Sequence, residues 1–121
     1  MKRNNKYIYP KTVRETLDGL RHYNIDDKEK LPSVTTILKA TESQEKQDSL
    51  AAWRARVGEA TAAKITEESA SRGTAMHKIL EKYILEEGYL DLTNVGKQAH
   101  NMALRVIEQG LCNLTEYYGT E

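Results

Sequence analysis

The amino-acid sequence predicts a mainly helical α+β fold, in which an N-terminal β-hairpin is followed by about five helices. Two observations favour this class. An Asp-Gly pair joins two half-apolar runs near the N-terminus, which is a strong signal for a hairpin. From residue 48 onward, apolar residues recur at the spacing typical of amphipathic helices. We therefore expect a hairpin region over residues 1–30 and a helical region over residues 31–121, which together form a single unit.

The hairpin is predicted to turn at Asp18 and Gly19, between strands over residues 13–17 and 20–25. Both residue types tolerate the positive φ that a two-residue hairpin loop requires. Residues 26–30 are all charged. This stretch is expected to be a polar connector that leads away from the hairpin.

A short helix is expected over residues 34–40. Pro32 restricts the preceding residue to an extended conformation. Ser33 follows, and serine is among the preferred residues at a helix N-cap. The polar residues 41–48 then separate this helix from the next.

The next helix is predicted to start near Asp48. Leu50, Trp53 and Val57 form one apolar stripe along it. Gly58 is expected to end or kink this helix, because glycine is a poor helix former.

Three more helices complete the predicted fold. The alanine-rich stretch over residues 59–70 favours a helix, and Arg72, Gly73 and Thr74 are expected to interrupt it. The next helix begins after this break and stops near Gly88. Its apolar stripe consists of Met76, Ile79, Leu80, Tyr83 and Ile84. The last helix closes at Gly110, and its stripe consists of Val95, Ala99, Met102, Ala103, Val106 and Ile107.

The composition excludes several classes of protein. The chain of 121 residues carries 18 basic and 18 acidic side chains, so a strongly basic nucleic-acid coat is excluded, although a local basic patch is not. Cys112 is the only cysteine, which excludes an internal disulfide framework and a cysteine-based zinc site. No apolar run approaches the roughly 20 residues of a membrane span. We expect a cytoplasmic protein that is not exported and does not enter a membrane.

His77 and Glu81 are the strongest candidates for chemistry. They lie four residues apart in a predicted helix and so share one face, with Gly73 one turn earlier. An imidazole and a carboxylate at this spacing can share a divalent cation or orient each other. A glycine at a helix entrance lets a phosphate approach the free amides of the first turn. Spacing alone does not separate this interpretation from that of a solvent-facing ion pair.

Three segments occur in a characteristic order: Leu31–Leu38, Trp53–Glu59 and Arg72–Glu81. Together with Arg21-His22-Tyr23, they resemble the N-terminal half of phage-type exonucleases of the PD-(D/E)XK superfamily. This branch includes RecB-like nuclease domains and the mitochondrial genome maintenance exonuclease. The resemblance runs from about residue 7 to residue 121.

The resemblance implies a DNA exonuclease that acts with Mg²⁺ or Mn²⁺ and accepts single strands or ends. It places His77 at the metal and the scissile phosphate, with Glu81 and Gly73 at matching positions. It also places Arg72 and Thr74 beside the phosphate path. Arg54 and Arg56 could follow the DNA backbone, since guanidinium groups match phosphate oxygens, or could simply face solvent.

Two features of the family are not found in the sequence. These are an aspartate on one strand and an (Asp/Glu)-x-Lys motif on the next, both expected after a segment like Tyr118–Glu121. The triplet Asp26-Asp27-Lys28 reads as a solvated turn. The expected fold is therefore an incomplete restriction-endonuclease-like nuclease fold that lacks the catalytic sheet. Such a truncated chain is expected to be inactive alone, to bind no metal, and to self-associate through exposed apolar helix faces.

Two alternatives remain open from the sequence. The first is a non-catalytic helical module that binds DNA or protein through Arg54, Arg56, Arg72 and Lys78. The second is a purely structural helical protein in which the pairing of His77 with Glu81 is incidental.

Overall fold

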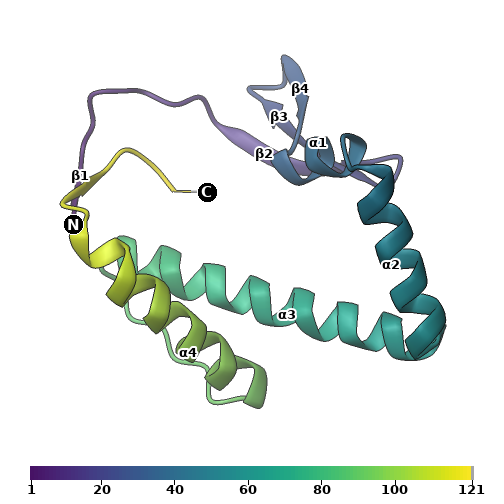
Figure 1. The fold of residues 1–121 in the computed structure, drawn as a ribbon. Coiled ribbons are helices and arrows are strands. Elements are labelled where there is room, and N and C mark those ends of the chain that lie inside the picture. The colour runs from purple at the N-terminus through teal and green to yellow at the C-terminus, as the bar shows by residue number, and fades with distance from the viewer. Residues whose placement is uncertain (121) are drawn as a thin grey trace. The chain divides into compact units, whose positions relative to one another are not determined.

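The computed structural model describes residues 1–120, which form a mainly helical α+β fold (Figure 1). The predicted class is confirmed at this level. The described residues contain four α-helices, one short 3₁₀ helix, a three-stranded sheet and a two-stranded sheet. In chain order the elements are β1 (Lys2–Arg3), β2 (Thr12–Leu17), β3 (Leu20–Ile25), β4 (Glu29–Pro32), α1 (Val34–Ala40), α2 (Gln44–Val57), α3 (Glu59–Ile84), α4 (Asn94–Gln109), η1 (Leu111–Asn113) and β5 (Glu116–Tyr117).

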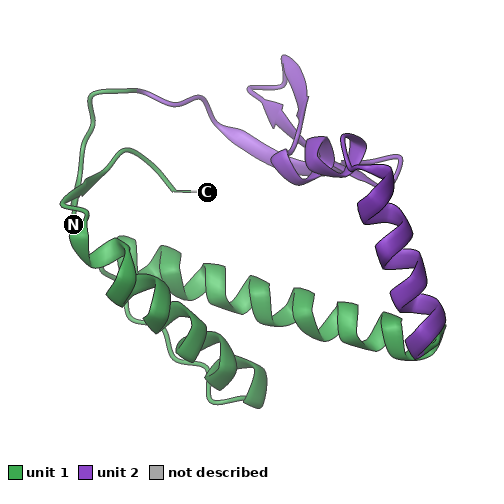
Figure 2. Ribbon diagram, in the orientation of Figure 1, with its two compact units in different colours: residues 1–7, 58–121 green, residues 8–57 purple. Residues whose placement is uncertain are grey.

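The chain divides into two compact units (Figure 2). Unit 1 consists of Met1–Tyr7 and Gly58–Glu121, and unit 2 consists of Ile8–Val57. Unit 2 is thus one continuous stretch of sequence between the two parts of unit 1. It contains β2, β3, β4, α1 and α2, whereas unit 1 contains β1, α3, α4, η1 and β5.

The sheet of unit 2 is antiparallel, with the strand order β2-β3-β4. β2 and β3 meet at the predicted turn, where Asp18 and Gly19 have φ of 52° and 76° and Leu17 pairs with Leu20. Positive φ at both central residues is the conformation that suits the twist of a two-residue hairpin. The prediction of the hairpin is confirmed.

The connector predicted over residues 26–30 is only partly correct, because β4 begins at Glu29. Asp26 and Asp27 turn the chain, with φ of 50° and 57°. Short polar side chains tolerate this left-handed conformation better than most. All residues of β4 are exposed, so the strand lacks the apolar alternation that would reveal it in the sequence.

Ser33 caps α1 and joins it to the sheet. The residue is only 4% exposed, and its hydroxyl accepts a hydrogen bond from the Thr36 N–H at 3.1 Å. The carbonyl of Arg21 in β3 accepts a bond from the Ser33 N–H at 3.1 Å and one from the Thr36 hydroxyl at 2.8 Å. The predicted N-cap and the predicted helix over residues 34–40 are confirmed.

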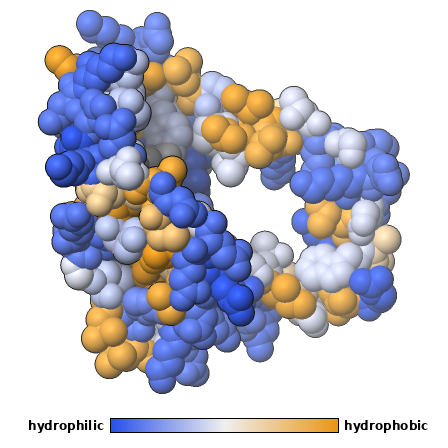
Figure 3. All heavy atoms as spheres, turned by 60° about the vertical axis from the view of Figure 1, so that its left-hand side comes forward, coloured by the Kyte–Doolittle hydropathy of each residue, from blue (hydrophilic) through white to orange (hydrophobic). Residues whose placement is uncertain are grey.

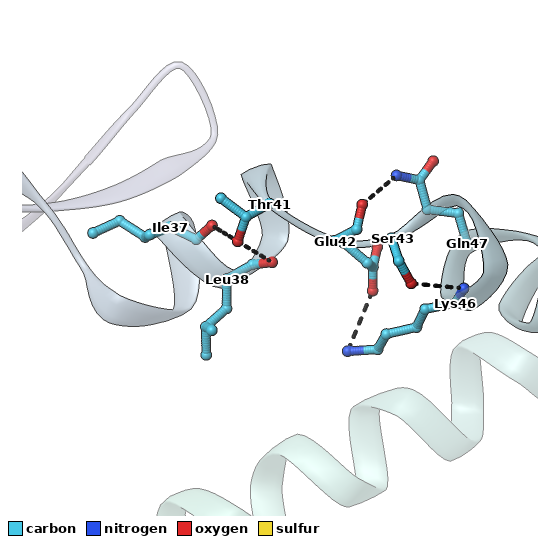
Figure 4. A network of polar contacts seen from close by, with 7 residues as sticks. All are labelled: Ile37, Leu38, Thr41, Glu42, Ser43, Lys46 and Gln47. Carbon is cyan, nitrogen blue, oxygen red and sulfur yellow. Dashed lines mark hydrogen bonds and ion pairs between the residues drawn. The ribbon is translucent and has the colours of Figure 1, made fainter.

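A group of polar contacts lies where α1 ends and α2 begins (Figure 4). The Ser43 hydroxyl accepts a hydrogen bond from the Lys46 N–H at 3.2 Å, and the Lys46 ammonium pairs with Glu42 at 3.4 Å. The first of these interactions satisfies a backbone N–H in the first turn of α2. Helix α2 consequently starts at Gln44, earlier than the predicted start near Asp48.

Helix α3 is longer than the sequence suggests. Gly58 separates it from α2, as predicted, with a φ of 89°. The interruption predicted at Arg72–Thr74 is wrong, because α3 runs from Glu59 to Ile84 without a break. The helices predicted over residues 59–70 and 76–88 are therefore one helix, and four α-helices are described where about five were expected.

The core of unit 1 lies between α3 and α4. Ile79 is 8% exposed, and Ala99 and Ala103 are 0% exposed. Alanines one turn apart on α4 let α3 approach closely, since they have no side chain beyond Cβ. The half-buried residues Ala75, Met76, Leu80 and Tyr89 pack against this cluster. The predicted last helix is confirmed, and its small residues form the packed face.

Apolar side chains remain exposed in both units. Val34 and Leu38 of α1 are 72% and 62% exposed, and Met102 and Leu104 of α4 are 39% and 50% exposed. Figure 3 shows patches of hydrophobic atoms between polar ones on the face in view. The expectation of incompletely covered helix faces agrees with this surface.

The ends of unit 1 meet in a small parallel sheet. Lys2 of β1 pairs with Glu116 of β5, and Arg3 pairs with Tyr117. The side-chain amide of Asn4 donates a hydrogen bond to the Glu116 carboxylate at 3.0 Å.

The start of α4 is fixed by a short polar motif. Thr93 is the N-cap, and its hydroxyl accepts a hydrogen bond from the Gly96 N–H at 3.0 Å. The Asp91 carboxylate accepts bonds from the hydroxyl and the N–H of Thr93, at 2.7 and 3.0 Å. These bonds, that from the hydroxyl first, favour the charged carboxylate and lower the pKa of Asp91 below its ordinary value of 3.8.

We expect Asp91→Asn to destabilise unit 1 near neutral pH and to lose this effect in acid. Because the folded-state pKa is lowered, the carboxylate stabilises the fold above pH 3.8, and the contribution disappears as the pH falls through the folded-state value. The free energy of unfolding, measured with urea at a series of pH values, tests this. Glu108→Gln on the exposed side of α4 is the control. A difference between Asp91→Asn and the original chain that does not change with pH would contradict the prediction.

Candidate functional site

Helix α3 carries the residues predicted to form the site in unit 1. Gly73, His77 and Glu81 follow one another at steps of four residues within this unbroken helix. Each step turns the helix by only about 40° beyond a full turn. The three residues therefore share one face, as the sequence predicts.

This face borders the one that packs on α4, because Leu80 of the packed face lies at nearly the same angle around the helix as Gly73. Ile79 contacts the buried alanines of α4, and its position two residues after His77 directs it to roughly the opposite side of the helix. His77 is exposed and Glu81 is half-buried. Within residues 1–120, no hydrogen bond or ion pair joins these two side chains. The imidazole is thus available to a ligand but is not held by the carboxylate.

Gly73 does not lie at a helix entrance, so that expectation is wrong. It lies well inside α3, where the backbone amides are engaged in the helix itself. A Cβ atom placed at Gly73 would meet no atom within 4 Å outside the helix backbone. The glycine therefore leaves a shallow open place on the helix surface beside His77.

The neighbours of Gly73 differ in their surroundings. Arg72 is half-buried, and its guanidinium donates a hydrogen bond to the side-chain oxygen of Gln98 in α4 at 3.4 Å. Thr74 is exposed. Arg72 lies on one side of the line from Gly73 to Glu81 and Thr74 lies on the other, each about 100° from Gly73 around the helix.

Arg54 and Arg56 belong to α2 in unit 2. Both side chains are exposed, and neither has an ion-pair partner within residues 1–120. Trp53 and Val57, which belong to the apolar stripe of that helix, are half-buried. The two arginines are free to meet an anion, but they belong to a different unit from His77.

The donor atoms of this site do not fit a magnesium ion by themselves. His77 and Glu81 offer one imidazole nitrogen and one carboxylate, whereas Mg²⁺ requires near-octahedral oxygen ligation. Among residues 1–120, no three His, Cys, Asp or Glu side chains are grouped so that they could hold a metal ion. Asp26, Asp27 and Lys28 are exposed at the turn before β4, as predicted.

His100 of α4 is a second histidine whose side chain is partly covered. The residue is half-buried, and its Nε2 atom is buried without a hydrogen-bond partner in the part of the chain that the structure describes. Its ring centre lies 6.4 Å from that of Tyr89. The spacing of His100 in the sequence could have indicated that it is partly covered. His100 lies three residues before Ala103 and seven before Ile107, which places it on the apolar side of α4.

No protein-family model, curated protein or solved structure matches this chain. None of the helices described for residues 1–120 combines the length and the apolar character that a membrane crossing requires.

Proposed function

We propose that this chain is the N-terminal, DNA-engaging portion of a metal-dependent PD-(D/E)XK exonuclease and that it does not hydrolyse DNA alone. The ordered resemblance of three segments supports this proposal. One structural observation carries it furthest: α3 places Gly73, His77 and Glu81 on one face, and His77 in the middle of that face is exposed. A site on such a face is open to a phosphate backbone.

In this proposal, the missing ligands explain why the chain is inactive. His77 would stand beside a metal ion and the scissile phosphate in the complete enzyme, with Glu81 one turn away. An aspartate and an (Asp/Glu)-x-Lys motif would have to come from outside residues 1–121. The single imidazole and carboxylate present here supply too little anionic oxygen for Mg²⁺ or Mn²⁺.

The arginines supply affinity for DNA in this proposal. Arg54 and Arg56 are exposed, and the guanidinium of Arg72 donates a long hydrogen bond to Gln98. Arginine binds phosphate oxygens through two parallel hydrogen bonds. Thr74 lies on the other side of the line from Gly73 to Glu81 and offers an exposed hydroxyl to the phosphate path.

We expect the chain to bind single-stranded DNA without degrading it in Mg²⁺ or Mn²⁺. Three arginine–phosphate contacts release counterions, so the logarithm of the affinity should fall against the logarithm of the salt concentration with a slope of about −2. Fluorescence anisotropy of a labelled oligonucleotide gives the slope, and gel electrophoresis shows whether the strand stays intact. Each of Arg54→Gln, Arg56→Gln and Arg72→Gln should reduce the slope by about 0.7.

Arg105→Gln is the matched control for these variants, because Arg105 is an exposed arginine of α4 outside the proposed site. It should leave the slope unchanged. An equal effect of Arg105→Gln would show that only the general charge of the chain attracts DNA. Degradation of the oligonucleotide that survives repeated purification would refute the proposed inactivity.

The coding DNA provides a second test of the nuclease proposal. An aspartate and an (Asp/Glu)-x-Lys motif should be encoded within about forty codons after Glu121, the span of two short strands and their turns. A stop codon directly after residue 121 would favour a non-catalytic binding module instead. In that alternative, Arg54, Arg56, Arg72 and Lys78 bind DNA or protein without any hydrolysis.

We also propose that the chain self-associates through its apolar helix faces. Val34 and Leu38 lie four residues apart on α1 and are 72% and 62% exposed, and side chains this apolar favour burial. Static light scattering should show a mass that rises with concentration. The double variant Val34→Glu, Leu38→Glu should reduce this rise, whereas Ala40→Glu on the same helix should not. A monomeric mass at every concentration would contradict the proposal.

A further inference from the structure

Unit 1 contains a cavity that the proposed nuclease site does not use. It has a volume of about 210 Å³ and lies between the second half of α3, the segment at Tyr89, and α4. The cavity is lined by the aliphatic residues Ile79, Ala103 and Ile107. It is also lined by the aromatic rings of Tyr83, Tyr89 and His100. Sites for drug-sized molecules are larger, so this cavity suits a single small ring.

His100 contributes its ring to the wall of the cavity. Its Nε2 is buried and has no hydrogen-bond partner within residues 1–120. Because this atom has almost no accessible surface, a ligand in the cavity can contact the ring but not this nitrogen.

Tyr89 lies near both the His100 ring and a positive charge. Its ring centre lies 6.4 Å from that of His100 and 5.2 Å from the Lys78 ammonium. Lys78 has no ion-pair partner within residues 1–120, whereas Lys82 at the cavity is paired with Glu87. The wall of the cavity thus contains aromatic rings, and a cation outside the wall lies over one of them.

We propose that this cavity binds one unstacked nucleobase of single-stranded DNA, with an adjacent phosphate close to Lys78. Bases stack on aromatic side chains and present donors and acceptors at their edges, while cations follow the phosphates. The choice of DNA over another small ring rests on the proposed function. The cavity itself is separate from the face of α3 that carries His77, which lies roughly opposite Ile79.

Abasic DNA separates base binding from phosphate binding. Anisotropy is measured with a labelled single-stranded oligonucleotide and with an oligonucleotide of equal length whose central nucleotides lack bases. The backbone charge is the same in both. The chain should bind the abasic strand about tenfold more weakly, since one stacked base contributes on this scale.

Variants then assign the difference to this cavity. Leu104 lines it and is 50% exposed, so Leu104→Trp fills the space without removing a polar group. This variant should bind both strands with nearly equal affinity. Leu114→Trp is the matched control, because Leu114 is 55% exposed and does not line the cavity. It should keep the tenfold difference.

His100→Ala is the second variant and removes a ring from the wall of the cavity. It should shrink the difference between the strands, and it tests the assignment if circular dichroism shows that Leu104→Trp does not fold. Equal binding of both strands by the original chain would overturn the inference but leave DNA binding intact. A failure to bind either strand would overturn the proposed function as well. A folded Leu104→Trp variant that keeps the tenfold difference would place the base elsewhere and refute the assignment.

Discussion

Replacing Ala103 by glutamate should unfold the pair of helices α3 and α4. Ala103 is 0% exposed and packs against Ile79, so a longer, charged side chain has neither space nor a partner there. Overpacking and the burial of an unpaired carboxylate together cost about 3 to 5 kcal/mol. This is comparable with the whole stability of many small domains.

Ala70→Glu is the matched control, because Ala70 is exposed on α3. It should change the free energy of unfolding by no more than about 0.5 kcal/mol. Circular dichroism at the helical minimum, followed through a thermal transition, distinguishes the two variants. If Ala103→Glu melted at the temperature of Ala70→Glu, the packing of α3 on α4 described above would be wrong.

Gly96→Ala and Gly73→Ala should change stability in opposite directions, although both place alanine inside a helix. A Cβ at Gly96 would overlap the side chain of Asp91, whereas a Cβ at Gly73 would meet no atom within 4 Å. Asp91 is short and is held by two hydrogen bonds from Thr93, so it cannot easily move away. We expect Gly96→Ala to destabilise by about 1 to 3 kcal/mol, and Gly73→Ala to stabilise by up to about 1 kcal/mol.

Urea titrations of the two glycine variants measure both changes directly. Gly73→Ala also tests the proposed function. If DNA approaches α3 at this open place, the stabilised variant should bind single-stranded DNA more weakly than the original chain. A variant that is more stable and binds DNA equally well would remove Gly73 from the proposed interface.

Local signals in the sequence predicted much of the fold. The turn at Asp18 and Gly19, the cap at Ser33 and the break at Gly58 each depend on the conformational preference of one or two residues. Neighbours in the sequence are enough to identify such features. The fully exposed strand β4 could not be found in this way, because its pairing with β3 depends on backbone hydrogen bonds and not on apolar alternation.

The unbroken α3 shows where local reasoning fails. Glycine and its polar neighbours at residues 72–74 favour a break by composition. In the structure, Ala75, Met76 and Ile79 lie directly after them in the packed core with α4. Tertiary packing contributes more to helix stability than local propensity does, and the sequence does not show which segment will pack there.

Only the part of the candidate site that depends on helical spacing could be predicted from the sequence. Helical spacing alone places His77 and Glu81 on one face, and this required no knowledge of tertiary structure. The surroundings of His100 did require it, because Tyr89 reaches that ring from the segment between the two helices. Whether a polar side chain at the edge of an apolar stripe is covered depends on what the connecting loop places above it.

The pairing of β1 with β5 determines the order in which the two units can be completed during translation. Lys2 pairs with Glu116, at nearly opposite ends of the described chain. The ribosome synthesises all of unit 2 before it adds any residue of α3. Closing so long a loop also slows the step, because the chain entropy of the intervening residues opposes it. Strand β1 is therefore made before the other described elements, but it can pair only after all of them have been made.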